Sequence, residues 1–399
     1  MKRGNGFSLV ELMTAMAILT VVVAATVGVL IKAQQAANGV ALAANTQENL
    51  RAGMHFLVRD LMQAGEGVPP GGILIPTNTS GASNLNRPGI ITPATTFPTA
   101  NTLLYVISPG YGLGQDAKTV SASTNAVLDG GLATDIINVV YADNTLIDAS
   151  GNYLNSHPVA SAAPVCGGTI NASGTSVTLA ASCFTMPGGP TPIAPGNLIL
   201  FTNVNGTALE YVTSVSGQTI NFAAGDPAGL NGLSAATYPN GTVAAIKAST
   251  TTTTITRVWM VTYYIDSTTN PSQPQLVRQV NYPGYPSAAP ANPPTPIADC
   301  VENLSFSYDL VNSGAPTGTY TNGPGDAPTP ASWAGPPAGA DSPVQIRAVN
   351  VTLEARSEYP FVAAPGSDYF HNSLSTQTSI RNLAFVNQFT TKTTATPGP

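Results

Sequence analysis

The sequence predicts an α+β protein in which one long N-terminal helix packs on an antiparallel, β-rich globular region. The helix is indicated by an apolar run over residues 12–31, after which no proline interrupts the chain before residue 65. The sheets are indicated by runs of β-branched and aromatic residues separated by turn dipeptides such as Asn205-Gly206 and Ser216-Gly217. Charged residues make up 9% of the chain, against about 25% in an average soluble domain. With 38 glycines and 34 prolines, this composition favours a folded, loop-rich, exported body.

The first half of the predicted helix has the length and composition of a membrane span. Residues 12–31 are apolar or small and carry no charge. At about 1.5 Å per residue they cover roughly 30 Å, the thickness of one bilayer core. Lys2 and Arg3 lie on the short N-terminal side, which the positive-inside tendency places in the cytoplasm. Nearly all of the chain is then exported.

Glu11 lies at the edge of this apolar run, where a charge is costly unless it has a partner. It either stays hydrated at the interface or meets a positive group when subunits pack. The segment Gly6-Phe7-Ser8-Leu9-Val10-Glu11 resembles the class III signal of type IV pilins and pseudopilins. The resemblance implies that a prepilin peptidase cuts after Gly6 and methylates Phe7. It also implies that Glu11 pairs with the N-terminus of a neighbouring subunit during assembly.

Two simpler explanations compete at this N-terminus. A secretory signal peptide has an apolar core of about 7–15 residues followed by a small-residue cleavage site. This apolar run is longer, and the nearest such site, Ala41-Leu42-Ala43, lies well beyond it. An uncleaved membrane anchor explains the run but accounts for neither Gly6-Phe7 nor Glu11.

A second resemblance is carried by residues 47–51, 57–65, 259–265 with 276–281, and 301–308. These segments resemble PilW-type minor pilins. The resemblance implies a minor pilin that takes part in the assembly, priming or tip of a type IV pilus. Its partners are then other major and minor pilins, which it contacts through the N-terminal helix. It also implies an inner-membrane location with a periplasmic body before assembly, and a location in the pilus at the cell surface afterwards.

The helix should continue to residue 64 and pack on the body through its second half. Apolar residues there recur at helical spacing and form one stripe: Leu50, Met54, Leu57 and Leu61. Four polar residues are expected to lie off that stripe: Arg51, Arg59, Asp60 and Gln63. The glycines and prolines of residues 65–70 end the helix. Gly28 stands where many pilins carry a helix-breaking proline, so we expect a softer helix at that point.

These features divide the chain into a leader (1–6), a helix (7–64, with 7–31 in the membrane or filament core) and a β-rich region (65–399). The β-rich region is expected to form one or two subdomains, at about 65–250 and 251–399. The predicted strands are residues 102–107, 135–141, 198–204, 208–215, 218–222, 242–247, 256–266, 276–281, 344–356 and 378–389. Residues 198–222 should form a three-stranded meander. Long loops are expected over residues 66–100, 283–296 and 313–343.

Three cysteines in an exported chain suggest one disulfide and one remaining thiol. Cys166 and Cys183 flank a turn-rich segment and are the expected pair, which leaves Cys300 free or buried. Pairing of Cys300 with either of the others stays open, because pairing depends on distance in space. The chain has no Cys-x-x-Cys motif and its histidines are scattered, so no metal site is expected.

No catalytic arrangement emerges from the sequence. Acidic residues are sparse, His371 stands alone without triad partners, and no glycine-rich phosphate loop follows a strand. We therefore expect a non-enzyme without a cofactor. The formal net charge is −6 and no basic cluster is present, which argues against nucleic acid as a partner. Two other functions stay open, a pseudopilin of a type II secretion system and a pilus-tip adhesin whose long loops bind a surface or a glycan.

Overall fold

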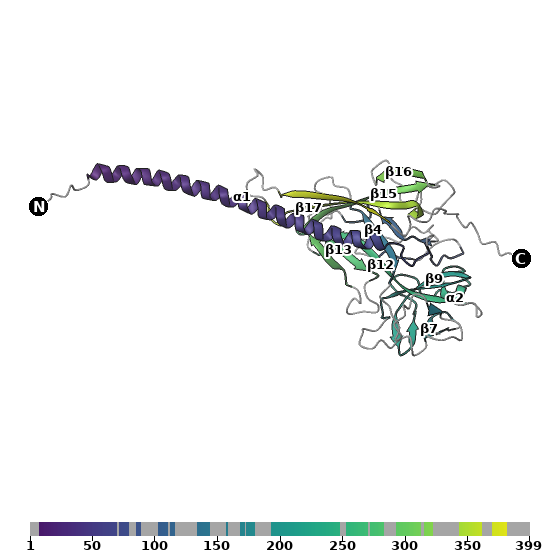
Figure 1. Cartoon of the computed structure of the whole chain (residues 1–399). Helices are drawn as coiled ribbons and strands as arrows, with labels where there is room; N and C mark the ends of the chain where they lie inside the picture. Colours follow the sequence, from purple (N-terminus) through teal and green to yellow (C-terminus); the bar gives the residue numbers. More distant parts are fainter. Residues whose placement is uncertain are drawn as a thin grey trace.

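The computed structural model contains one long helix and a body built from three larger sheets and a short strand pair (Figure 1). It describes residues 8–69, 72–79, 85–88, 103–110, 112–115, 134–143, 157–158, 168–171, 173–179, 193–247, 253–269, 272–282, 293–312, 315–321, 343–360 and 369–380. The predicted α+β class is confirmed.

Helix α1 spans Leu9–Gln63, 55 residues, in one uninterrupted element. Figure 1 shows its first half projecting from the body and its second half lying against the body. The helix begins at the N-cap Ser8. It ends where Gly65 and Gly67 adopt φ angles of 78° and 65°, which side chains other than glycine rarely take. The backbone stays helical at Gly28, so the softening expected there remains a prediction.

The second half of α1 buries the predicted stripe. Leu50, Met54, Leu57 and Leu61 are all buried in the main hydrophobic core. The prediction for Asp60 is wrong, because its side chain is completely buried. Asp60 follows Leu57 by three residues, and side chains three or four positions apart share a helix face.

The largest sheet has eight strands and forms the centre of the body. Its main path runs β14 (Thr295–Asp299), β13 (Gln275–Val280), β12 (Thr254–Asp266), β4 (Ile136–Ala142) and β3 (Ile107–Gly110). Strands β5 (His157–Pro158) and β8 (Leu198–Asn203) also pair with β12, and β9 (Gly206–Tyr211) pairs with β8. Strands β12 and β13, both expected from the sequence, pair with each other antiparallel. The division expected near residue 250 runs through this sheet, since β4 lies before it and its partner β12 after it.

A second, four-stranded sheet has the order β16 (Ala315–Thr321), β15 (Val301–Asn312), β17 (Ile346–Arg356) and β18 (His371–Ser379). A 3-10 turn, η3 (Pro343–Gln345), leads into β17. The second half of α1 contacts β14 of the first sheet and β17 and β18 of the second. One hydrophobic core therefore joins the helix to both sheets. A short pair, β1 (Ile73–Leu74) and β2 (Leu103–Leu104), lies within the residues expected to form the first long loop and its following strand.

A smaller module lies between β4 and β12 in the chain. It contains β6 (Gly168–Ile170), β7 (Ser176–Leu179), β10 (Ser214–Ser216), β11 (Thr219–Asn221) and the short helix α2 (Val243–Ile246). Its apolar residues form a separate core around Phe201 and Phe222. In Figure 1 this module sits at the end of the body away from the projecting half of α1.

Four expected elements differ in the structure. The expected three-stranded meander is divided between two sheets. Val212 N still donates to Asn197 O, next to the largest sheet, whereas Thr213 N donates to Asn221 O in the smaller one. The strand expected at 242–247 is helix α2, whose N-cap Thr242 accepts a hydrogen bond from Ala245 N. The loop expected at 313–343 contains strand β16. The last strand, expected at 378–389, begins earlier, since β18 covers His371–Ser379, and residues 381–389 lie outside the described residues.

The expected disulfide lies outside the described residues, since both Cys166 and Cys183 do so. Cys300 is a buried free thiol. Its φ of 55° turns the chain sharply between β14 and β15. Burial raises the pKa of this thiol, so its reactive thiolate form is disfavoured.

Candidate functional site: the projecting helix and its anchor

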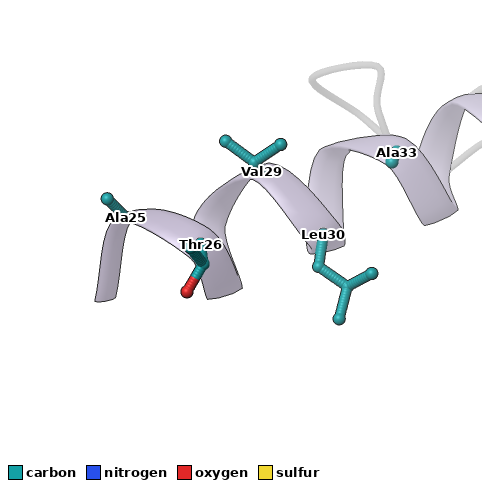
Figure 2. Close-up of a pocket in the computed structure, with 5 residues that line it drawn as sticks. All are labelled: Ala25, Thr26, Val29, Leu30 and Ala33. Atoms are coloured by element: carbon teal, nitrogen blue, oxygen red, sulfur yellow. The ribbon is translucent and has the colours of Figure 1, made fainter. Parts of the chain in front are cut away.

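The projecting half of α1 is an apolar surface that nothing in the described chain covers. It contains an 18-residue window of membrane-spanning composition in which no residue is buried. Large exposed side chains occur all around it, among them Leu9, Met13, Val21 and Val29. Figure 2 shows Ala25, Thr26, Val29 and Leu30 projecting from successive turns, with Ala33 one turn further on. Such a surface is stable in water only when lipid or other helices cover it.

The threonines of this half are compatible with a membrane. Thr14, Thr20 and Thr26 each donate their hydroxyl to the carbonyl three residues earlier, at 3.0, 2.8 and 2.8 Å. These bonds leave no hydroxyl hydrogen without an acceptor, which is the requirement that hydrocarbon imposes. Glu11 is then the one ionisable residue between Leu9 and Ile31.

Glu11 forms a capping box with Ser8 at the start of α1. Its Oε2 accepts the Ser8 backbone N–H at 3.0 Å, and Ser8 Oγ accepts Val10 N–H at 3.2 Å. Within the described chain, Oε1 has no partner. The carboxylate is therefore oriented by its own helix while one oxygen stays available to a cation. Gly6 and Phe7, the expected processing residues, lie outside the described residues.

The anchor of α1 is a buried polar cluster that we call the Asp60 cluster. It consists of Asp60, its helix neighbour Arg59, and three side chains from strands β4, β12 and β13: Tyr141, Tyr263 and Arg278. Asp60 Oδ2 accepts from Arg278 Nε and from the Tyr263 hydroxyl, each at 2.6 Å. Oδ1 has longer contacts of 3.4 Å with Tyr141 and Arg59. Strands β12 and β13 place Tyr263 directly opposite Arg278.

The electrostatics of the cluster favour two neutral phenols and a charged guanidinium. Burial, followed by the negative charge of Asp60, raises the pKa of Tyr263 well above its ordinary value. The same causes raise the pKa of Tyr141 to about 12. Burial alone would lower the pKa of Arg278, but the hydrogen bond and charge of Asp60 raise it overall. The helix is thus fastened to β4, β12 and β13 by charge-assisted hydrogen bonds, which are stronger than neutral ones.

Gly53 lets the second half of α1 approach the sheets closely. A Cβ at this position would lie 2.9 Å from Leu276 Cδ2 and 3.2 Å from Ala298 Cβ. Helix propensity alone presents this glycine as a weak point costing about 1 kcal/mol relative to alanine. The structure shows that it is a contact point with β13 and β14.

A second ionic group joins the start of β15 to the end of β17 and the start of β18. Glu302 Oε1 lies 3.0 Å from Arg356 Nε, and Glu302 Oε2 lies 3.2 Å from His371 Nδ1. Arg356 also donates to Ser272 O at 2.6 Å and stacks on Tyr369, 4.0 Å from the ring centre. The expectation that His371 stands alone is therefore wrong, because residues distant in sequence meet at this corner of the sheet.

A buried acid on strand β9 lies apart from the helix α1. Glu210 is 3% exposed, its Oε1 accepts Val243 N–H at 3.2 Å, and its Oε2 has no hydrogen-bond partner among the described residues. Burial, opposed by that hydrogen bond, raises the pKa of Glu210 well above its ordinary value. The folded state therefore binds this proton more tightly than the unfolded state does.

The Glu210→Gln variant should unfold at a higher temperature than the native chain at pH 8, and at nearly the same temperature near pH 4.5. The stabilisation from the raised pKa is fully present below the unfolded value and is lost as the pH rises toward the folded one. Glutamine keeps the acceptor for Val243 and carries no charge. Thermal unfolding of the detergent-solubilised chain across this range measures the effect. Glu48→Gln, at an exposed position of α1, controls for the loss of one charge. If the unfolding temperatures of the native and Glu210→Gln chains are equal at every pH, the prediction is wrong.

Comparison with protein families gives one match, to the prokaryotic N-terminal methylation motif, over residues 1–27. No curated protein and no solved structure matches the chain. The matched residues contain Gly6, Phe7, Glu11 and the first turns of the projecting helix. The chain therefore carries a prokaryotic N-terminal methylation motif of the prepilin type at the start of a long apolar helix that is joined to a β-rich body.

Proposed function

We propose that this chain is a minor pilin, a structural subunit that takes part in assembling or priming a type IV pilus. The proposal rests on one combination: a prepilin-type motif at residues 1–27 leads directly into a helix half that is entirely uncovered. The segments that resemble PilW-type proteins support the minor-pilin role. Two of them, at 259–265 and 276–281, form the neighbouring strands that hold Asp60.

In this proposal the projecting half of α1 has two successive environments. Before assembly it lies in the inner membrane, with the N-terminus in the cytoplasm and the β-rich body in the periplasm. A prepilin peptidase removes residues 1–6 and methylates Phe7. During assembly the helix leaves the bilayer and enters a bundle of similar helices formed by major and minor pilins. Because its apolar area is covered in both places, the transfer has little net hydrophobic cost.

Glu11 is the residue whose environment changes most in this transfer. In the bundle its carboxylate is removed from water, which is unfavourable unless a cation accompanies it. Cleavage before Phe7 creates a free amine one residue before Ser8, and the amine of a neighbouring subunit supplies that cation. Glu11 Oε1, which the capping box leaves available, is the atom we assign to this contact.

A pseudopilin of a type II secretion system has the same N-terminal requirements and is the second candidate. The prepilin-type motif favours both equally. The genes beside this one distinguish them, since pilus and secretion components are encoded in different clusters.

Mass analysis of the native protein tests the proposal. Protein from membranes or sheared filaments should begin at a methylated Phe7, with residues 1–6 absent. A chain that still begins at Met1 would identify a plain membrane anchor, and one that begins well beyond residue 31 a secreted protein. Either result overturns the filament proposal.

A further inference from the structure

Strand β18 is an edge strand that differs from the other edges of the two large sheets. Among the described residues it pairs with β17 on one side only, through nine residue pairs without a register shift. The edge strands β3, β5, β14 and β16 each contain a proline, and the edge strand β9 contains an acidic residue, Glu210. Prolines at sheet edges block the addition of further strands. β18 has no proline, lysine, arginine or acidic residue.

The hydrogen-bond pattern shows which backbone groups face outward. At the two ends of the ladder, Ser357 N donates to Phe370 O and Ile380 N donates to Arg347 O. Bonded and non-bonded pairs alternate in an antiparallel ladder, so the even-numbered residues of β18 bond β17. The odd-numbered residues direct N–H and C=O away from β17 and are all exposed: His371, Ser373, Ser375, Gln377 and Ser379. Among the described residues, this edge presents a row of unpaired backbone donors and acceptors.

The two faces of β18 define what fits beside it. The odd-numbered side chains lie on the outer face, where Ser375 Oγ is 2.9 Å from Thr352 Oγ1 and Gln377 Nε2 donates to Asp309 Oδ2 at 2.6 Å. On the inner face, Leu374 packs against the main core. A matching strand therefore alternates uncharged polar side chains on the outer face with apolar ones on the inner face.

We propose that the free edge of β18 binds an extended segment of a neighbouring pilin-like subunit, which joins this sheet as a fifth strand. The inference rests on the proposed function. β18 contacts the second half of α1, and in Figure 1 this yellow strand runs alongside α1 toward its projecting half. When subunits associate through their projecting helices, the side of each body where β18 lies against α1 faces the neighbouring subunits. The β18 edge is thus continuous with the proposed helix–helix interface.

Substitution of Ser375 separates edge binding from folding. Ser375→Pro removes an N–H that points to the free edge, not one that bonds β17, and Ser375→Ala keeps that N–H. We expect Ser375→Pro to lower the amount of the chain in sheared filaments by roughly fivefold to tenfold, from one lost backbone bond and the clash of the ring. Ser375→Ala should be incorporated like the native chain. The thermal unfolding of Ser375→Pro in detergent should stay close to that of Ser375→Ala. If Ser375→Pro folds and is incorporated equally well, the proposal is wrong.

Photo-crosslinking in intact cells identifies the occupant. A photoreactive residue at Ser375 should crosslink to an extended segment of another chain that carries the same N-terminal motif. The matched control is Ser305, on the same sheet and two strands from the edge, since it pairs with Thr352, which pairs with Ser375. If Ser375 crosslinks only to this chain's own residues after Ile380, the chain's own tail covers the edge. If Ser305 crosslinks to other subunits with the same yield as Ser375, the edge does not bind them preferentially. Both results overturn the inference.

A third photoreactive position, Val22 on the projecting helix, distinguishes the two proposals. Subunit crosslinks from Val22 without any from Ser375 refute edge binding and leave the proposed filament function intact. If Val22 also gives no subunit crosslink in filament-producing cells, the filament function itself fails.

Discussion

The Asp60→Ala variant should lose about 3–5 kcal/mol of its free energy of unfolding, the cost of removing one partner from a buried ion pair. Without the carboxylate, Arg278 keeps its charge inside the protein, and the Tyr263 hydroxyl loses its acceptor. The second half of α1 also loses its polar attachment to β12 and β13. Chemical denaturation of the full chain in detergent, followed by circular dichroism and tryptophan fluorescence, measures the change.

Two further variants make this prediction specific. Asp299→Asn alters an exposed aspartate of β14 that is hydrogen-bonded to Gln275 at 2.8 Å, and it should change stability by less than about 0.5 kcal/mol. The double variant Asp60→Leu with Arg278→Met replaces both charges by apolar side chains and should recover much of the loss. If Asp60→Ala is as stable as Asp299→Asn, the cluster does not anchor the helix.

The Glu11→Ala variant should be processed normally but should be nearly absent from filaments. Its neighbour's N-terminal amine would enter the helix bundle without a counter-charge. Leaving a buried charge unpaired costs about 3 kcal/mol or more, which corresponds to a roughly hundredfold lower incorporation. The measurement compares the methylated chain in membranes with the chain in sheared filaments. Glu48→Ala, on the same helix but outside its apolar half, should be incorporated normally.

Glutamine at this position separates the two roles of Glu11. The Glu11→Gln side chain still accepts the Ser8 N–H and so keeps the capping bond seen at 3.0 Å, but it has no charge. We expect this variant to be excluded from filaments almost as strongly as Glu11→Ala. Normal incorporation of Glu11→Gln would mean that Glu11 acts through the helix cap, and the charge-pairing proposal would be rejected.

The features that the sequence predicted are local. A helix face repeats every 3.6 residues, so the stripe of Leu50, Leu57 and Leu61 is visible in one short stretch of chain. The processing motif is likewise a contiguous segment that can be recognised without a fold. The sequence predicts strands β4, β12 and β13 near their observed bounds, because runs of β-branched and aromatic residues between turn residues favour strands.

Some local signals were outweighed by their surroundings. The residues 242–247 follow an Asn-Gly turn signal and contain Val243 and Ile246, which favours a strand. In the fold, Thr242 caps a helical turn. The side chains of Val243 and Ile246 are buried in the separate core around Phe201 and Phe222. The turn at Asn205-Gly206 was predicted correctly, yet the next strand changes sheets at Thr213 because Asn221 offers its carbonyl there.

The sequence by itself therefore determined the helix, its membrane-like half, its docking stripe and the methylation motif, since each depends on neighbours along the chain. The tertiary structure decided that Asp60 is buried beside Arg278, 218 residues away. It also placed Gly53 against Ala298 and left β18 at a sheet edge. Burial and pairing of this kind depend on which distant segments meet, and that is fixed only when the hydrophobic faces of the helix and both sheets close over one core.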